Sequence, residues 1–264
     1  PDGKIKQISF STIVHKASDD WTKPDNYLLS RFAFSYLYYC AQIKKSDRHQ
    51  RRTGGFVGMG IEYEDAFLEE VLKQFKHSIQ DNLNEEELRG LYMAPLKFAV
   101  DEVERCAKIL QGQYFINQEV NQGSILEKIK NRKIIHFSVH ALVDEADYFN
   151  SFILLNKDAK QDFQLSYKEV LKENINSDLV VLSACQTGLG HNVVGEGLMS
   201  MTRAFIQSGS DATLGSYWNA PDKPTMELME LFYANIQKGM TKSKALQNAQ
   251  LTYLSDDIRS TPLV

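Results

Sequence analysis

The stretch 178–190, DLVVLSACQTGLG, decides the fold class of this 264-residue chain. Its residues 179–182 form an unbroken apolar run, which is typical of a strand buried on both faces in a parallel sheet flanked by helices. Open α/β sheets place their chemistry at the carboxyl ends of such strands, and Cys185 stands at that end. The stretch therefore predicts an α/β fold in which Cys185 is either a nucleophile or a small buried hydrophobe.

The composition is that of an ordinary globular protein and argues against several classes of partner. Hydrophobic residues make up 43% of the chain, and the formal net charge is -4. A net charge of this sign and size does not indicate binding to nucleic acid or to an anionic membrane surface. The basic run at 44–52 is typical of a solvated loop. No apolar run approaches the roughly 18 residues of a membrane span. Three cysteines without paired spacing fit a reducing compartment, so we expect a cytoplasmic protein.

Helical and strand-like segments alternate along the chain. Strands are predicted at 4–14, 30–37, 54–63, 114–117, 133–140, 179–182 and 211–218. Helices are predicted at 63–89, 94–110, 121–131, 196–209, 224–239 and 241–254, with a further one between 140 and 179. Strands separated by helices of ten or more residues form right-handed crossovers, which predicts a parallel sheet. The N-terminal third looks semi-independent, and we place the boundary after residue 92.

The stretch 133–140, KIIHFSVH, places a second reactive group at the edge that carries Cys185. Strand alternation puts His136, Ser138 and His140 on one face, and His140 falls at the strand's end. If this strand neighbours the one before Cys185, both carboxyl ends lie at the same edge. A nearby imidazole raises the thiolate fraction of a cysteine and can protonate a leaving amine. The pattern thus predicts a thiol–imidazole pair.

The residues following these two strands supply further candidates. The backbone N–H groups of Ala141 and Cys185 could stabilise an oxyanion. Asp144 and Glu196 adjoin the pair, where a carboxylate could orient the histidine or hold a loop, although surface solvation is the default for such residues.

Motifs for metal or nucleotide binding are weak. His136 and His140 are four residues apart, a ligand spacing that suits a helix, but their segment is predicted to be a strand, and no other ligand cluster supports zinc. The glycines of 188–197 lie between a strand and a helix, yet match neither G-x-G-x-x-G nor a G-K-[ST] ending. No G-x-S-x-G element is present. We therefore expect no metal and no cofactor.

Several motifs, in order, resemble the CHAT domains, which are caspase- and separase-like cysteine peptidases often attached to TPR repeats. IIHFSVHALVD (134–144) is similar to the family's H-F-A-T-H-G stretch, and LVVLSACQTGLG (179–190) to its S-A-C-x-T-G element. The stretch 195–210, which begins GEG, is close to the family's G-E-G element, and further similarities at 1–14, 27–36, 215–222 and 245–254 extend the match to nearly the whole chain.

The resemblance implies a caspase-like three-layer fold with a mostly parallel central sheet flanked by helices. Residues 1–92 would be the noncatalytic part and 93–264 the catalytic domain. It also implies a cysteine endopeptidase with His140 as base and Cys185 as nucleophile, cleaving a specific protein substrate without metal or organic cofactor. Upstream TPR repeats or a regulatory partner, and a role in bacterial defence or signalling, are implied too. Ala141 departs from the family, which has glycine after the histidine.

The resemblance also suggests where substrate binds. In caspase-like enzymes the strand after the nucleophile's helix pairs with the substrate, which makes Ser216, Tyr217 and Trp218 candidates for backbone pairing and pocket walls. Asn219 and Asp222 would supply the polar end of the pocket. Trp218 is alternatively a core residue, and Asp222 alternatively a cap of the following helix.

A second function stays open. The chain could be a catalytically weak pseudopeptidase that binds proteins through the same cleft or an exposed sheet edge. The presence of both His140 and Cys185 favours the enzyme.

Overall fold

The computed structural model describes most of the chain in two compact units, formed by residues 38–223 and by residues 1–37 with 224–264. The described residues are 23–35, 54–75, 93, 95–142, 144, 147–160, 162–183, 191–193, 197–199, 201–216 and 220–255. The strand predicted at 4–14 lies outside them.

The unit of residues 38–223 is built on a five-stranded parallel sheet with the strand order β10-β7-β3-β1-β2. Its strands are β1 (Gly54–Gly60), β2 (Gln113–Ile116), β3 (Arg132–Ser138), β7 (Leu179–Leu182) and β10 (Thr213–Gly215). The predicted α/β class and parallel sheet are confirmed. Because β3 and β7 are neighbours, with Ile135 opposite Val180, their carboxyl ends meet at one edge.

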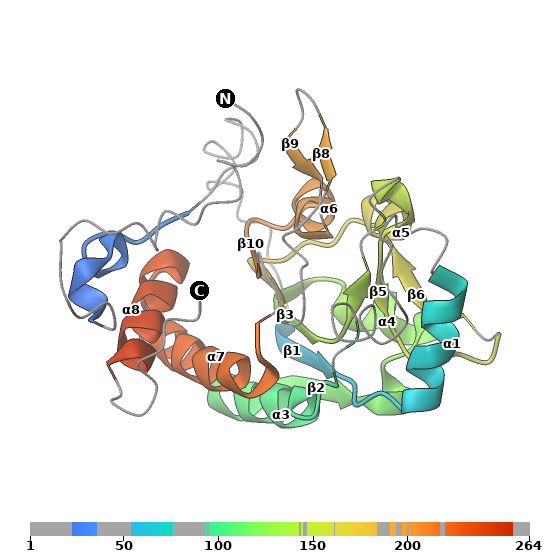
Figure 1. Cartoon of the computed structure of the whole chain (residues 1–264), viewed down its shortest axis with the longest axis horizontal. Helices are drawn as coiled ribbons and strands as arrows, with labels where there is room; N and C mark the ends of the chain where they lie inside the picture. The colour runs from blue at the N-terminus through green and yellow to red at the C-terminus, as the bar shows by residue number, and fades with distance from the viewer. Residues whose placement is uncertain are drawn as a thin grey trace. The chain divides into compact units, whose positions relative to one another are not determined.

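Helices cover both faces of this sheet and give three layers (Figure 1). The helices of this unit are α1 (Asp65–Phe75), α3 (Ala99–Leu110), α4 (Gln122–Ile129), α5 (Tyr167–Lys172) and α6 (Met201–Gln207). Helices α4, α5 and α6 share one hydrophobic core with the face of β3 that carries Ile135 and Phe137. Helix α3 packs on the opposite face, which carries His136.

Glycines in β1 let α3 approach the sheet closely. A Cβ added to Gly60 would lie 2.6 Å from the carbonyl oxygen of Ala99, and one added to Gly58 would lie 2.9 Å from Cβ of Val103. Such distances leave no room for a side chain. The glycines of this strand therefore set the position of α3.

Short antiparallel strands were missed by the sequence prediction. They are β4 (Ala141–Leu142), β5 (Phe152–Leu154) and β6 (Gln164–Ser166), which form one small sheet, and the pair β8 (His191–Val193) and β9 (Gly197–Met199). Runs of two or three residues are too short to show an alternating pattern. Helix α1 covers the small sheet, with Leu68, Val71 and Leu72 in a cluster with Leu142 and Phe152. Single 3₁₀ turns lie at η6 (Asn117–Glu119) and η7 (Tyr148–Asn150).

The other unit is helical in its described part. It contains η3 (Pro24–Asn26), η4 (Leu28–Ser30), α8 (Lys242–Leu254) and most of α7 (Asp222–Gln237). The strand predicted at 30–37 is wrong over its described residues, which continue from η4 without strand structure. The Ser30 hydroxyl donates to the Tyr27 carbonyl oxygen (2.8 Å), a local bond that competes with strand pairing, and Phe32 is 55% exposed. The side-chain amide of Gln247 donates to the Leu29 carbonyl oxygen and ties α8 to η4.

The compact units divide the chain at positions other than residue 92. Strand β1, from the part predicted to be noncatalytic, lies between β3 and β2 in the sheet. The functional boundary after residue 92 stays a prediction. No helix within the described ranges is long and apolar enough to cross a membrane.

Candidate active site

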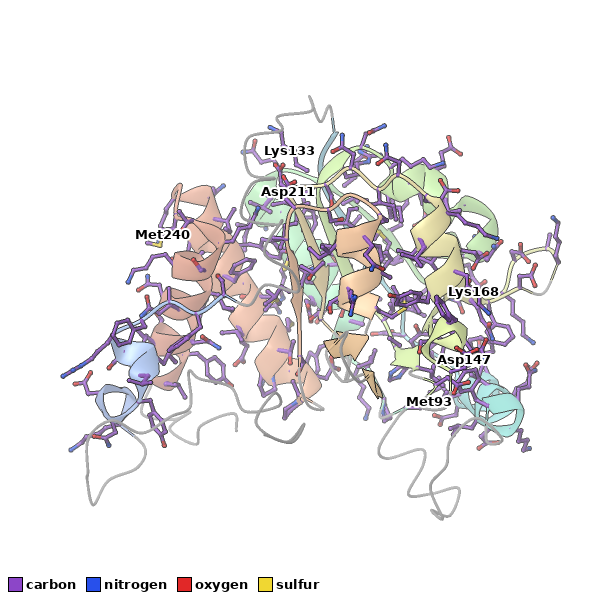
Figure 2. All side chains as sticks on the ribbon, turned by 90° about the horizontal axis from the view of Figure 1, so that it is seen from above. Met93, Lys133, Asp147, Lys168, Asp211 and Met240 are labelled. Carbon is purple, nitrogen blue, oxygen red and sulfur yellow. The ribbon has the colours of Figure 1, made fainter. Side chains whose placement is uncertain are left out.

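The carboxyl ends of the parallel strands bring four segments to one edge of the sheet. His140 follows β3, Ser183 follows β7, Ser216 follows β10 and Tyr63 follows β1. The Ser183 N–H donates to the Phe137 carbonyl oxygen (2.8 Å), so β3 and β7 remain paired up to this edge. Figure 2 shows the opposite edge, where Lys133 and Asp211, at the amino ends of β3 and β10, lie on the far side from Asp147.

Part of the predicted site lies outside the described residues. Cys185 is two positions beyond Ser183, and Tyr217, Trp218, Asn219 and Glu196 are also undescribed. The contact between His140 and Cys185 stays a prediction, as do the pocket roles of residues 217–219.

His140 is fully buried, and its backbone and ring are both held. Its N–H donates to the Tyr63 hydroxyl oxygen (3.2 Å), and its carbonyl oxygen accepts from the Leu154 N–H (2.8 Å). The rings of His140 and Tyr63 lie with centroids 5.0 Å apart at 30°. Tyr63 was not predicted from the sequence, since an aromatic residue after a strand carries no signal of a site.

Ala141 begins β4 and pairs with Ile153 of β5. The bond from the Leu154 N–H to the His140 carbonyl oxygen makes His140 and Leu154 a hydrogen-bonded position of the antiparallel ladder. Ala141 and Ile153 therefore occupy a non-hydrogen-bonded position, in which the N–H of each residue points away from the partner strand. The Ala141 N–H is thus directed away from β5, an orientation compatible with oxyanion binding.

A buried polar network lies under the edge, on the α3 face of the sheet. Nε2 of His136 lies 2.8 Å from Oε1 of Glu102, and the Ser183 hydroxyl donates to the same oxygen. None of the three residues is more than 7% exposed. The network joins α3, β3 and the residue that follows β7, two positions before Cys185 in the chain. His136 contacts this carboxylate, and within the described segments no group of three or more His, Cys, Asp or Glu is placed to hold a metal.

Asp222 lies at the end of the candidate substrate-binding segment, residues 216–222, and connects it to α3. Its Oδ2 accepts from the Phe98 N–H at the start of that helix (2.7 Å). Burial raises the pKa of the Asp222 carboxyl, the carboxylates of Glu102 and Glu62 raise it further, and the backbone N–H groups of Phe98 and Lys97 oppose the shift. Asp222 is the first residue of α7, and its bond to the start of α3 is a contact that the sequence did not predict.

Asp144 holds a loop beside the candidate site. It is buried, its Oδ1 accepts from the Asp147 N–H (2.9 Å) and its Oδ2 accepts from the Asn150 side-chain amide (3.4 Å). The default of a solvated surface residue is therefore wrong for Asp144, and the loop-holding alternative fits these bonds.

Comparison with known proteins matches nearly the whole chain to one family. Residues 1–263 match the family model of the CHAT domain. Over 102 residues the chain is 28% identical to tetratricopeptide repeat protein 28 of Mus musculus and 29% identical to that of Homo sapiens, covering 39% of this chain and 4% of each relative. The chain thus spans only a small part of these curated relatives.

A solved structure shares the fold. The crystal structure of the Arg-specific cysteine proteinase gingipain R superposes with a TM-score of 0.50 at 10% identity, covering 84% of this chain and 49% of that one. At this identity the likeness concerns the fold, and it confirms the caspase-like arrangement of a parallel sheet between helical layers.

Proposed function

The chain belongs to the CHAT domain family, and from that premise we propose that it is a cysteine endopeptidase acting on a specific protein substrate through His140 and Cys185. The observation that carries the proposal is the pairing of β3 with β7. This pairing places the end of one strand, with His140 anchored, beside the strand that leads to Cys185.

The proposed reaction needs only groups of this chain. The Cys185 thiol gives its proton to His140 and attacks the scissile carbonyl carbon. His140 then protonates the leaving amine as the peptide bond breaks, and water hydrolyses the resulting thioester. The N–H groups of Ala141 and Cys185 are assigned to the oxyanion, and the orientation of the Ala141 N–H away from β5 supports its part. No metal or organic cofactor enters this scheme.

Substrate is assigned to the segment that follows β10. In the described sheet β10 is an edge strand, so an extended peptide could add beside it and continue past Ser216. Tyr217, Trp218 and Asn219 then form the walls and polar end of the pocket. Asp222 supports this segment by fixing its far end to α3 through the Phe98 N–H, in addition to any direct contact with substrate.

The proposal for how the peptidase is regulated, and in which cellular setting it acts, draws on the relatives. The similarity to tetratricopeptide repeat protein 28 supports an association with TPR repeats, which we assign to an upstream segment or a partner that controls the peptidase. We place the activity in a cytoplasmic defence or signalling pathway, with residues 1–92 as the noncatalytic part.

Limited alkylation tests the proposed pair without knowledge of the substrate. Iodoacetamide at neutral pH should modify Cys185 before Cys106, which is fully buried in α3 and serves as the internal control. His140→Ala should slow the labelling of Cys185, because it removes the group that raises the thiolate fraction, and should leave Cys106 unchanged. Mass spectrometry of the peptides assigns each site. If Cys185 reacts as slowly as Cys106, or His140→Ala has no effect, the nucleophile assignment fails and the protein-binding alternative replaces it.

A further inference from the structure

We propose that Tyr63 is a positioning residue for His140, with its hydroxyl inserted into the backbone ladder that holds the histidine. The inference rests on the proposed function for its chemical meaning. The geometry that supports it involves only described residues.

The hydroxyl of Tyr63 lies between two backbone groups that face each other across strands. It accepts from the His140 N–H (3.2 Å) and donates to the Leu154 carbonyl oxygen (2.7 Å). In an antiparallel ladder a hydrogen-bonded pair exchanges two N–H to C=O bonds. His140 and Leu154 make one of them directly, from the Leu154 N–H to the His140 carbonyl oxygen. The second connection runs through the Tyr63 hydroxyl, so this side chain bridges the ladder at the histidine.

The backbone that carries Tyr63 is itself fixed to the sheet. The Ile61 N–H donates to the Ser138 carbonyl oxygen (3.3 Å), which continues the pairing of β1 with β3. The Glu62 N–H donates to the side chain of Asn117 (3.0 Å) on the other side. Tyr63 therefore enters the site from a rigid strand end, and a rigid support is what precise placement of a catalytic group requires.

The ring of Tyr63 adds a second constraint. It packs against the imidazole of His140 at a centroid distance of 5.0 Å and against the ring of Phe67 at 6.3 Å. Tyr63 thus controls the backbone of His140 with its hydroxyl and the imidazole with its ring. A misplacement of about 1 Å in a reacting group can cost on the order of a hundredfold in rate, so loss of either constraint should be measurable.

Tyr63→Phe separates the two constraints, since it removes the hydroxyl and keeps the ring. The matched control is Tyr167→Phe. That tyrosine is fully buried, whereas Tyr63 is partly buried, and it donates its hydroxyl to Gln207 Oε1 (3.2 Å), away from His140. Tyr63→Phe removes the hydroxyl bonds to His140 and Leu154, Tyr167→Phe removes the hydroxyl bond to Gln207, and a melting curve checks that both variants fold.

Amide hydrogen exchange tests the bridge directly. In Tyr63→Phe the His140 amide should exchange about tenfold faster relative to the wild type, because its acceptor is gone. In Tyr167→Phe it should be unchanged. Equal protection of the His140 amide in both variants would overturn the bridge, whether or not the protein is a peptidase.

Alkylation of Cys185 tests the link to the proposed pair. Tyr63→Phe should lower the labelling rate about tenfold, Tyr63→Leu should lower it further, and Tyr167→Phe should not change it. In the His140→Ala background Tyr63→Phe should have no additional effect, because it acts through the histidine. An equal loss in that background would refute the positioning role. Labelling of wild-type Cys185 that does not depend on His140 would instead refute the proposed function, and the exchange arm would still decide whether Tyr63 holds His140.

Discussion

Replacing Ser183 by alanine removes a hydroxyl donor to the buried Glu102 carboxylate. The Ser183 hydroxyl and His136 Nε2 both bond to Oε1 of Glu102, and the group is almost entirely shielded from water. A hydrogen bond to a charged group contributes about 1.5–3 kcal/mol, whereas a bond between neutral groups contributes about 0.5–1.5 kcal/mol. We therefore expect Ser183→Ala to lower the free energy of unfolding by about 2 kcal/mol.

A matched control lies near the amino end of β7. Ser177 precedes β7, is fully buried, and donates its hydroxyl to Ser210 (2.8 Å), a bond between two neutral groups. Ser177→Ala makes the same chemical change and should cost about 1 kcal/mol. The difference between the two variants isolates the contribution of the carboxylate.

The assay is urea unfolding followed by far-UV circular dichroism, with the free energy taken by linear extrapolation. The slope of each transition shows whether a variant has changed the unfolding reaction itself. Equal losses for Ser183→Ala and Ser177→Ala, or a larger loss for Ser177→Ala, would refute a charge-assisted bond between Ser183 and Glu102.

Two further variants test contacts made by α3. Because burial raises the pKa of Asp222, its stabilising contribution is fully present below the unfolded pKa and is lost as the pH rises through the folded pKa. Between pH 4 and pH 7 the wild type should therefore lose unfolding free energy relative to Asp222→Asn, whose side chain does not titrate. A difference between the two proteins that does not change with pH would contradict this. Gly60→Ala should lower the free energy of unfolding by about 1–3 kcal/mol, because its Cβ would lie 2.6 Å from the Ala99 carbonyl oxygen. Gly55→Ala, whose Cβ would meet nothing within 4 Å, should change it by less than about 0.5 kcal/mol, and equal melting temperatures for the two would rule out the close contact.

Patterns within single elements predicted much of the sheet. The apolar run at 179–182 and the alternation along 133–140 are local signals, and they correctly gave β7 and the two faces of β3. The glycines of β1 are likewise visible in the sequence, and the structure uses them for the close approach of α3. Each of these signals depends on the period of a strand or on the size of one residue.

The contacts that define the candidate site carry no such signal. Tyr63 is 77 residues from His140, Glu102 is 81 residues from Ser183, and Asp222 is 124 residues from Phe98. Nothing in the neighbourhood of Tyr63 or Glu102 marks it as a partner of the site. Only the order of the strands in the sheet brings these residues together.

The sequence by itself therefore determined the fold class, the family and the two strands that His140 and Cys185 follow in the chain, because periodicity and ordered motifs depend on residues close together in the sequence. The tertiary structure decided how His140 is held, what Glu102 and Asp222 contact, and where the short strands of the small sheet lie. These features depend on packing between segments far apart in the chain, since a buried polar group must find its partner wherever the fold places one.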